Sequence, residues 1–315
     1  MPKKTLKNIF KIIVSLALLI FILNKINLTK TWEALNNTNP LWLLWPLSIL
    51  IITTLLRTYR WYLLQQRVGK PLSYINLLRL NYIGHYFNTF LPTRLGSDVV
   101  KAYYLSKKHG ITIVNSSISV FTDRFLGIIA FVILNLLSLG IGYRQLPAWV
   151  ILTTLSINLT LIILVLQSVN SLGFFENLFK RFEFSKKIKE AYHELKKLNL
   201  KKGLLSNLII LSLFAHLIFV GYNFSFAHIL NLDLSFKAFF IYIPIIATIV
   251  LIPITINGLG FREYLIILLF QSAGLTLEEA FAFGILSRVV NLLHSAIGGL
   301  VYLSEGLHPT QDESL

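Results

Sequence analysis

The chain contains no cysteine among its 315 residues, and acidic side chains are few. The absence of cysteine excludes disulfide bonds, thiolate catalysis and cysteine-ligated zinc. Asp and Glu number 14 against 29 Lys and Arg, which gives a formal net charge of +15. A charge of this size suits a nucleic-acid-binding protein. However, the basic residues flank long apolar runs, a placement that membrane topology and anionic lipid favour, so we expect no nucleic-acid partner.

Motifs for common enzyme chemistries are also missing, including the P-loop, H-E-x-x-H, G-x-S-x-G and D-x-D. One fragment, Ser287-Arg288 followed by His294, resembles part of a membrane phosphatidic-acid phosphatase signature in which Arg binds phosphate and His attacks it. Gly298 stands where the aspartate partner of that His is expected, and the second His segment that would protonate the leaving group is missing. We therefore expect no enzymatic activity, no cofactor and no metal site.

Long apolar runs dominate what is present, because the chain is 55% hydrophobic and 14% charged, with a mean hydropathy of +0.68. About 20 apolar residues suffice for a helix to cross the hydrocarbon core. We expect one all-α, polytopic membrane domain over residues 1–315, with an uncleaved first span because no small-residue cleavage site follows it. The six expected spans are Asn8–Leu23, Leu41–Leu64, Ile111–Leu139, Trp149–Val169, Leu204–Leu230 and Thr276–Ser304.

Two further apolar segments are interrupted by helix-breaking residues, and we expect both to be re-entrant. Ile75–Pro92 leads into the motif L-P-T-R-L-G-S-D, and Phe239–Ala273 contains the motif I-P-I-T-I-N-G-L-G-F-R-E. Pro and Gly release backbone groups that hydrocarbon cannot satisfy, so a break at membrane depth needs protein or polar surroundings. The residues expected to break the helices or to satisfy their backbone are Asn88, Pro92, Gly96, Pro244, Pro253, Asn257, Gly258 and Gly260.

The distribution of charge predicts the topology. The N-terminus and the loops around Arg67 and Lys107 are basic, so the positive-inside rule places both chain termini on the cytoplasmic side of the cell membrane. The expected outer loops are Asn24–Asn39, Gly140–Ala148 and Asn231–Lys237. The segment 174–202 carries nine Lys or Arg against four Glu and repeats apolar residues every three or four positions. This pattern predicts an amphipathic helix on the cytoplasmic leaflet, with a docking site for a partner enzyme as the alternative.

The two interrupted segments show a similar order of residues, one in each half of the chain. On the expected topology they enter the membrane from opposite faces. Such a pattern is typical of an inverted repeat, in which alternating access takes place around a site near the bilayer midplane. The alternative is coincidence, because Pro and Gly are common in membrane helices.

Four segments, in order, carry a family resemblance. The run N-T-F-L-P-T-R-L-G-S-D-V-V-K-A from Asn88, the run F-T-D-R-F-L-G from Phe121, the motif Ile252–Glu263 and Arg288 resemble the lysylphosphatidylglycerol synthase transmembrane-region family, also called the flippase-like domain. The resemblance implies a lipid-handling membrane domain. In multiple peptide resistance factors this domain translocates aminoacylated phosphatidylglycerol and precedes a soluble synthase domain. We expect no lysyl transfer, because no synthase domain follows the last span before Leu315.

Two residues differ from the family pattern but carry the same sign of charge as the residue they replace. Asp123 replaces the usual Glu, and Lys101 replaces the usual Arg. Lys lacks the planar fork of Arg, so a phosphate would be held more loosely at that position.

Charged residues inside these segments form the candidate site. Arg pairs with phosphate oxygens through two parallel N–H donors and keeps its charge, which suits a lipid headgroup that crosses the bilayer. Carboxylates would hold these cations when no lipid is bound and would carry protons if transport is proton-coupled. The alternative is a structural role for neighbouring pairs, namely Asp98–Lys101, Asp123–Arg124 and Arg262–Glu263. The expected substrate-binding residues are Arg94, Lys101, Arg124, Arg262 and Arg288, and the expected charge partners are Asp98, Asp123 and Glu263.

The sequence thus predicts translocation of an anionic phospholipid or a polyprenyl-phosphate-linked lipid by alternating access around an Arg-lined site. The expected partner is membrane lipid. The alternative hypothesis is a non-transporting membrane protein that binds lipid for a separate lipid-modifying enzyme or glycosyltransferase.

Overall fold

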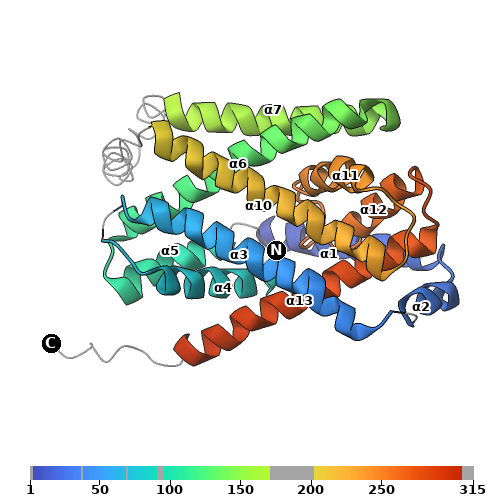
Figure 1. Cartoon of the computed structure of the whole chain (residues 1–315), viewed down its shortest axis with the longest axis horizontal. Coiled ribbons are helices and arrows are strands. Elements are labelled where there is room, and N and C mark those ends of the chain that lie inside the picture. The colour runs from blue at the N-terminus through green and yellow to red at the C-terminus, as the bar shows by residue number, and fades with distance from the viewer. Residues whose placement is uncertain (1–2, 37, 69, 91–95, 171–201, 307–315) are drawn as a thin grey trace. The chain divides into compact units, whose positions relative to one another are not determined.

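The computed structural model describes residues 3–36, 38–68, 70–90, 96–170 and 202–306. Regular structure in these residues is entirely helical, which confirms the expected all-α class. The amphipathic segment expected over 174–202 lies outside the described residues, except for Lys202. The α-helices are labelled in Figure 1. The helices are α1 (Lys3–Leu23), α2 (Leu28–Asn36), η1 (Pro40–Leu43), α3 (Leu44–Gln65), α4 (Tyr74–Phe90), α5 (Gly96–His109), α6 (Ile113–Gly142), η2 (Tyr143–Gln145), α7 (Ala148–Asn170), α10 (Lys202–Ile229), α11 (Phe236–Ile249), α12 (Phe261–Gln271) and α13 (Leu277–Gly306).

Five stretches of helix are long and apolar enough to cross a membrane, and they correspond to the second to sixth expected spans. Their mean hydropathies lie between 1.5 and 2.4, and each is at least 19 residues long. The chain is therefore a multi-pass membrane protein. The five stretches are Pro40–Gln65, Ile113–Gln145, Ala148–Leu166, Gly203–Ile229 and Leu277–Ser304.

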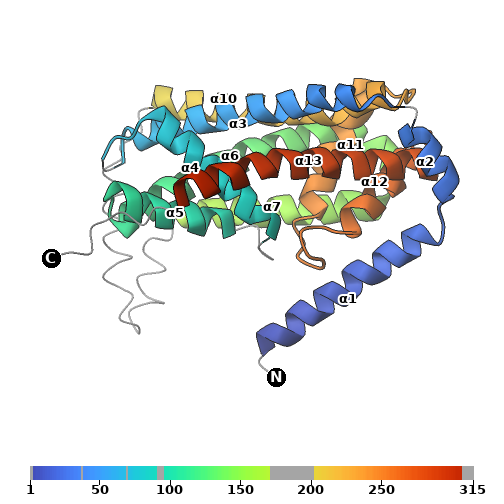
Figure 2. The ribbon, with the colours of Figure 1, turned by 90° about the horizontal axis from the view of Figure 1, so that it is seen from below.

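The first expected span, Asn8–Leu23, lies within α1, and a sharp bend joins α1 to α2. Phe10–Leu23 of α1 and Leu28–Asn36 of α2 pass the same test only as a pair, and they are bent by 86° (Figure 2). Part of the expected outer loop Asn24–Asn39 is thus the helix α2, and the side of the membrane on which it lies stays a prediction. Asn27 allows this helix to begin, because its side-chain oxygen accepts the Lys30 N–H at 3.2 Å and so satisfies a donor of the first turn.

The chain divides into two compact units. Unit 1 comprises Met1–Ile51, Ile133–Asn158 and Leu217–His294, and unit 2 comprises Ile52–Val132, Leu159–His216 and Ser295–Leu315. The helices α3, α6, α7, α10 and α13 contribute residues to both. Each unit contains one of the two interrupted segments together with the first part of the 30-residue helix that follows it, α6 in unit 2 and α13 in unit 1.

The interrupted segment of unit 1 consists of α11, a turn region over 250–260 that includes Pro253, and α12. Asn257, Gly258 and Gly260 have positive φ angles of 49°, 73° and 77°, a conformation that glycine adopts most readily. Gly260 also has no room for a side chain, because a Cβ would lie 2.9 Å from the carbonyl oxygen of Ser15 in α1. The expected break at these three residues is confirmed.

Pro244 does not interrupt its helix, contrary to expectation, and lies inside α11. Its ring prevents the backbone hydrogen bond to the carbonyl of Phe240, and the Ser138 hydroxyl of α6 donates to that carbonyl at 2.8 Å instead. Asn135 donates to the Pro244 carbonyl at 2.8 Å and accepts a hydrogen bond from Asn158 of α7 at 3.2 Å. These side chains satisfy polar groups that hydrocarbon could not, and so the helix continues past the proline.

The interrupted segment of unit 2 consists of α4 and α5, which pack against each other. Asn88 lies in the last turn of α4, and the buried Gly96 begins α5. Pro92 and Arg94 lie outside the described residues. The two helices are therefore separate elements, as the broken segment predicts, whereas re-entry into the membrane stays a prediction for both segments.

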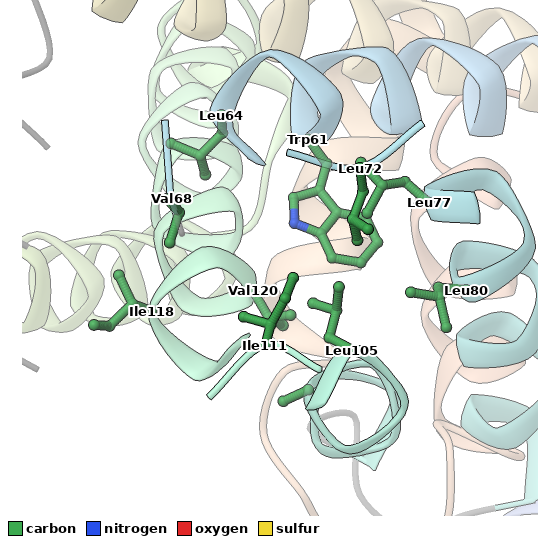
Figure 3. Packing of buried hydrophobic residues seen from close by; sticks show 11 residues of the cluster. Trp61, Leu64, Val68, Leu72, Leu77, Leu80, Leu105, Ile111, Ile118 and Val120 are labelled. Atoms are coloured by element: carbon green, nitrogen blue, oxygen red, sulfur yellow. The ribbon is translucent and has the colours of Figure 1, made fainter. Parts of the chain in front are cut away.

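A buried hydrophobic cluster in unit 2 surrounds Trp61 of α3 (Figure 3). Its side chains come from α3, α4, α5, α6 and the connections between them, and Trp61, Leu64, Leu77 and Leu105 are each no more than 1% exposed. The indole Nε1 of Trp61 donates to Ser119 Oγ at 2.9 Å. This packing fixes α3, α5 and α6 against one another, and these three helices carry Arg60, Asp98, Lys101, Asp123 and Arg124.

Candidate functional site

A buried carboxylate occupies the same position in both interrupted segments. Asp98 is the third residue of α5, and Glu263 is the third residue of α12, at 7% and 3% exposure. A negative charge in the first turn stabilises a helix, because the unpaired N–H groups there carry partial positive charge. Glu263 makes this contact directly, since its Oε2 accepts the Gly260 N–H at 2.9 Å.

Each carboxylate pairs with an arginine of the following long helix. Arg124 of α6 donates to Asp98 Oδ2, and Arg288 of α13 donates through Nε and Nη2 to Glu263 Oε1 at 3.0 and 2.8 Å. The paired residues are 26 and 25 positions apart in sequence, and each arginine is the twelfth residue of a 30-residue helix. At about 1.5 Å per residue, both arginines lie roughly 16 Å along their helices. Both positions fall within stretches that are long and apolar enough to cross a membrane.

A second arginine accompanies each pair. In unit 2, Arg60 of α3 forms a two-point ion pair with Asp123, with Nε–Oδ1 and Nη2–Oδ2 distances of 2.8 and 2.7 Å, and its Nη1 donates to Ser212 of α10. In unit 1, Arg262 Nη2 donates to Ser287 Oγ at 2.8 Å, and its Nη1 lies 3.6 Å from Glu263 Oε1. The group that accepts from this second arginine directly precedes the arginine of the pair in sequence: Asp123 precedes Arg124, and Ser287 precedes Arg288.

The expected pairs between sequence neighbours are largely wrong. Asp98 pairs with Arg124 rather than with Lys101, and Asp123 pairs with Arg60 rather than with Arg124. The Arg262–Glu263 pair is present at 3.6 Å, but Arg288 approaches the same carboxylate more closely, at 2.8 Å.

Lys101 of α5 faces an aromatic ring rather than forming an ion pair within the described residues. Its Nζ lies 5.4 Å from the centre of the Trp61 ring, within the range of a cation–π contact. Gly84 of α4 leaves space for its stem, because a Cβ at that position would lie 2.6 Å from Lys101 Cε. Lys101 thus belongs to the same cluster as Arg60, Asp98, Asp123 and Arg124, all of which influence it electrostatically.

We refer to Arg60, Asp98, Lys101, Asp123 and Arg124 as the unit 2 cluster, and to Arg262, Glu263, Ser287 and Arg288 as the unit 1 cluster. Sequence analysis missed Arg60 and its neighbour Arg57. The signal that identifies them is present, because two arginines inside the expected span Leu41–Leu64 are costly in hydrocarbon and mark a functional or paired position.

The arginines differ in what they can still bind. Arg60 is 8% exposed and donates from all three guanidinium nitrogens, so it is a structural residue. Arg124, Arg262 and Arg288 keep 33%, 21% and 28% of their side chains exposed while they pair with carboxylates. A partly accessible guanidinium can share its donors between a carboxylate and an incoming anion, as a phosphate-binding site requires.

Five membrane-spanning helices, together with two interrupted segments that carry matching arginine–carboxylate pairs, define a polytopic membrane protein with charged side chains built into its spanning helices. The family model for the lysylphosphatidylglycerol synthase TM region matches residues 8–298, and the chain belongs to this family. It is also similar to the UPF0104 membrane protein MJ1595 of Methanocaldococcus jannaschii, with 23% identity over 323 residues that cover 96% of this chain and 95% of the relative. The resemblance seen in the sequence is thereby confirmed.

Proposed function

We propose that the protein translocates an anionic phospholipid or a polyprenyl-phosphate-linked lipid across the cell membrane. The observation that carries the proposal is the matching arrangement in the two units, where an accessible arginine at membrane depth pairs with a buried carboxylate at the start of a half-helix. Membership of a family defined by a lipid synthase's membrane region supports a lipid as the molecule that is handled.

The charges supply a physical route for a headgroup. A lipid phosphate cannot cross hydrocarbon unpaired, because a desolvated anion costs many kcal/mol. In the proposed cycle, Arg124 and Arg288 are held by Asp98 and Glu263 when no lipid is bound, and each shares its N–H donors with the phosphate as it passes. Lys101 and Arg262 add positive charge beside the two pairs. Access alternates between the two membrane faces, and both chain termini lie in the cytoplasm.

A liposome assay tests the proposal. The protein is reconstituted with a fluorescent analogue of phosphatidylglycerol, and dithionite quenching reports how fast the analogue moves between leaflets. We expect Arg124→Gln and Arg288→Gln each to slow this movement by at least about tenfold, equivalent to about 1.4 kcal/mol of barrier. Arg144→Gln is the matched control, because Arg144 is exposed and contacts Tyr143 outside both clusters.

The outcomes separate the two hypotheses for this family member. Rapid quenching that the cluster variants abolish supports transport. Unchanged quenching in those variants contradicts it. Binding of the analogue without any movement between leaflets contradicts transport and favours a protein that binds lipid for a separate enzyme.

A further inference from the structure

The helix α2 is too short to cross a membrane, and it follows α1 after a nearly right-angled bend. Its nine residues rise about 13.5 Å, less than half of a hydrocarbon core that is roughly 30 Å thick. The stretches Phe10–Leu23 of α1 and Leu28–Asn36 of α2 are bent by 86° relative to each other (Figure 2). The helix α2 is therefore a separate element rather than the end of a straight span.

Both ends of α2 lie beside the first residues of spanning stretches. Asn36, its last residue, precedes by four positions the start of the spanning stretch Pro40–Gln65. The backbone N–H of Asn27, directly before α2, donates to Glu278 Oε1 at 3.1 Å, and Glu278 is the second residue of the spanning stretch Leu277–Ser304 (Figures 1 and 2). These contacts all lie within unit 1. A short helix joined to the ends of two spans lies near a membrane face.

The two sides of α2 differ in polarity. The apolar side, with residues three or four positions apart, is formed by Leu28, Thr31, Trp32 and Leu35. The polar side is formed by Thr29, Lys30, Glu33 and Asn36. Thr31 is 4% exposed and faces the protein, whereas Leu28 and Trp32 are 59% and 66% exposed. Part of the apolar side therefore points away from the protein, where contact with water is unfavourable.

Exposed apolar side chains recur where the next span begins. Leu41 and Trp42 of η1 are 70% and 56% exposed, and Leu44 and Trp45 of α3 are 61% and 42% exposed. With Trp32, this short part of unit 1 holds three of the five Trp residues of the chain. Trp is enriched where hydrocarbon meets water, because its ring is apolar and its N–H is polar. The residues around α2 thus have the composition of a membrane–water boundary.

We propose that α2 lies in the plane of the membrane–water interface, where Leu28 and Trp32 contact lipid and Lys30 and Glu33 face water. Lys30 and Glu33 are the charged residues of α2, and their charges cancel. Burial of apolar area therefore drives the contact, and attraction to anionic headgroups contributes little. The partner of this surface is the boundary between headgroups and acyl chains, whatever the headgroup charge, and the contact does not depend on lipid being transported.

Spin labelling tests this placement, because the chain has no cysteine and a single introduced cysteine labels one position. The full chain is reconstituted in liposomes, and power saturation with oxygen and a water-soluble nickel chelate reports the depth of the label. In Leu28→Cys and Trp32→Cys the label should lie about 5–10 Å inside the boundary between headgroups and acyl chains. In Glu33→Cys it should lie in water. In the reference variant Leu155→Cys, at the middle of the spanning stretch Ala148–Leu166, it should lie near the middle of the bilayer.

All four labelled side chains are exposed, so labelling should leave the fold intact. Labels at Leu28 and Trp32 as deep as that at Leu155 overturn the inference, because α2 would then continue a broken span. Nickel access at Leu28 equal to that at Glu33 also overturns it, because α2 would then lie in water. A label at Leu28 or Trp32 that neither reagent reaches overturns it as well, because α2 would then pack against protein, such as a second copy of this chain.

The lipid composition separates apolar burial from attraction between charges. Equal label depths in phosphatidylcholine liposomes with and without phosphatidylglycerol support contact through apolar burial. Insertion of α2 only when phosphatidylglycerol is present overturns this part of the inference.

Discussion

Replacement of Glu263 by Gln should destabilise unit 1 strongly, because this carboxylate joins three groups. It accepts the Gly260 N–H at 2.9 Å, receives Nε and Nη2 of Arg288 at 3.0 and 2.8 Å, and lies 3.6 Å from Arg262 Nη1. Gln keeps an oxygen for the Gly260 N–H and loses the negative charge. Two half-buried arginines then repel each other without a counter-ion.

The expected loss follows from burial. Breaking a fully buried ion pair costs about 3–5 kcal/mol. Arg262 and Arg288 keep 21% and 28% exposure, so water reduces the penalty, and we expect about 2–3 kcal/mol. At about 2–4 °C per kcal/mol, the midpoint of thermal unfolding should fall by roughly 4–12 °C.

The assay compares thermal unfolding of the detergent-solubilised variant with that of Glu33→Gln. Glu33 lies exposed on α2, and its replacement should shift the midpoint by less than about 1 °C. A Glu263→Gln midpoint that moves no more than that of Glu33→Gln would refute the view that this carboxylate holds the arginines of unit 1.

Three other substitutions should each lower either the thermal stability of the protein or the rate at which it moves lipid. Ser138→Ala removes the donor to the carbonyl that Pro244 leaves unpaired, so thermal unfolding should report about 1 kcal/mol less stability; no change would mean that another group satisfies the carbonyl. Gly258→Ala forces a side chain into a φ of 73°, and the same measurement should show a loss of about 1–2 kcal/mol, whereas a stabilised variant would contradict the strained turn. Gly84→Ala should displace the stem of Lys101 and slow lipid movement in the liposome assay, and an unchanged rate would remove Lys101 from the proposed route.

Much of the fold follows from local features of the sequence. The five long spans are continuous apolar runs, and the break in unit 1 follows from Asn257, Gly258 and Gly260, because such residues permit positive φ angles. The continuation of α11 through Pro244 could not be predicted. It depends on Ser138, which is 102 positions from the carbonyl that it satisfies.

The candidate site follows from sequence only in part. Arginines and carboxylates inside apolar segments indicate where charge must be paired, and this identifies Asp98, Arg124, Glu263 and Arg288. Their partners depend on which helix faces meet, and no local rule connects Arg60 with Asp123 across 63 positions.

The central claim is that both arginine–carboxylate pairs serve the same lipid movement, and a double-mutant comparison in the liposome assay tests it most directly. If Arg124 and Arg288 act on one route, the Arg124→Gln/Arg288→Gln protein should move lipid about as slowly as the slower single variant, because either change alone already blocks that route. Single variants that move lipid at the wild-type rate, or a double variant whose loss equals the product of the two single losses, would contradict the claim.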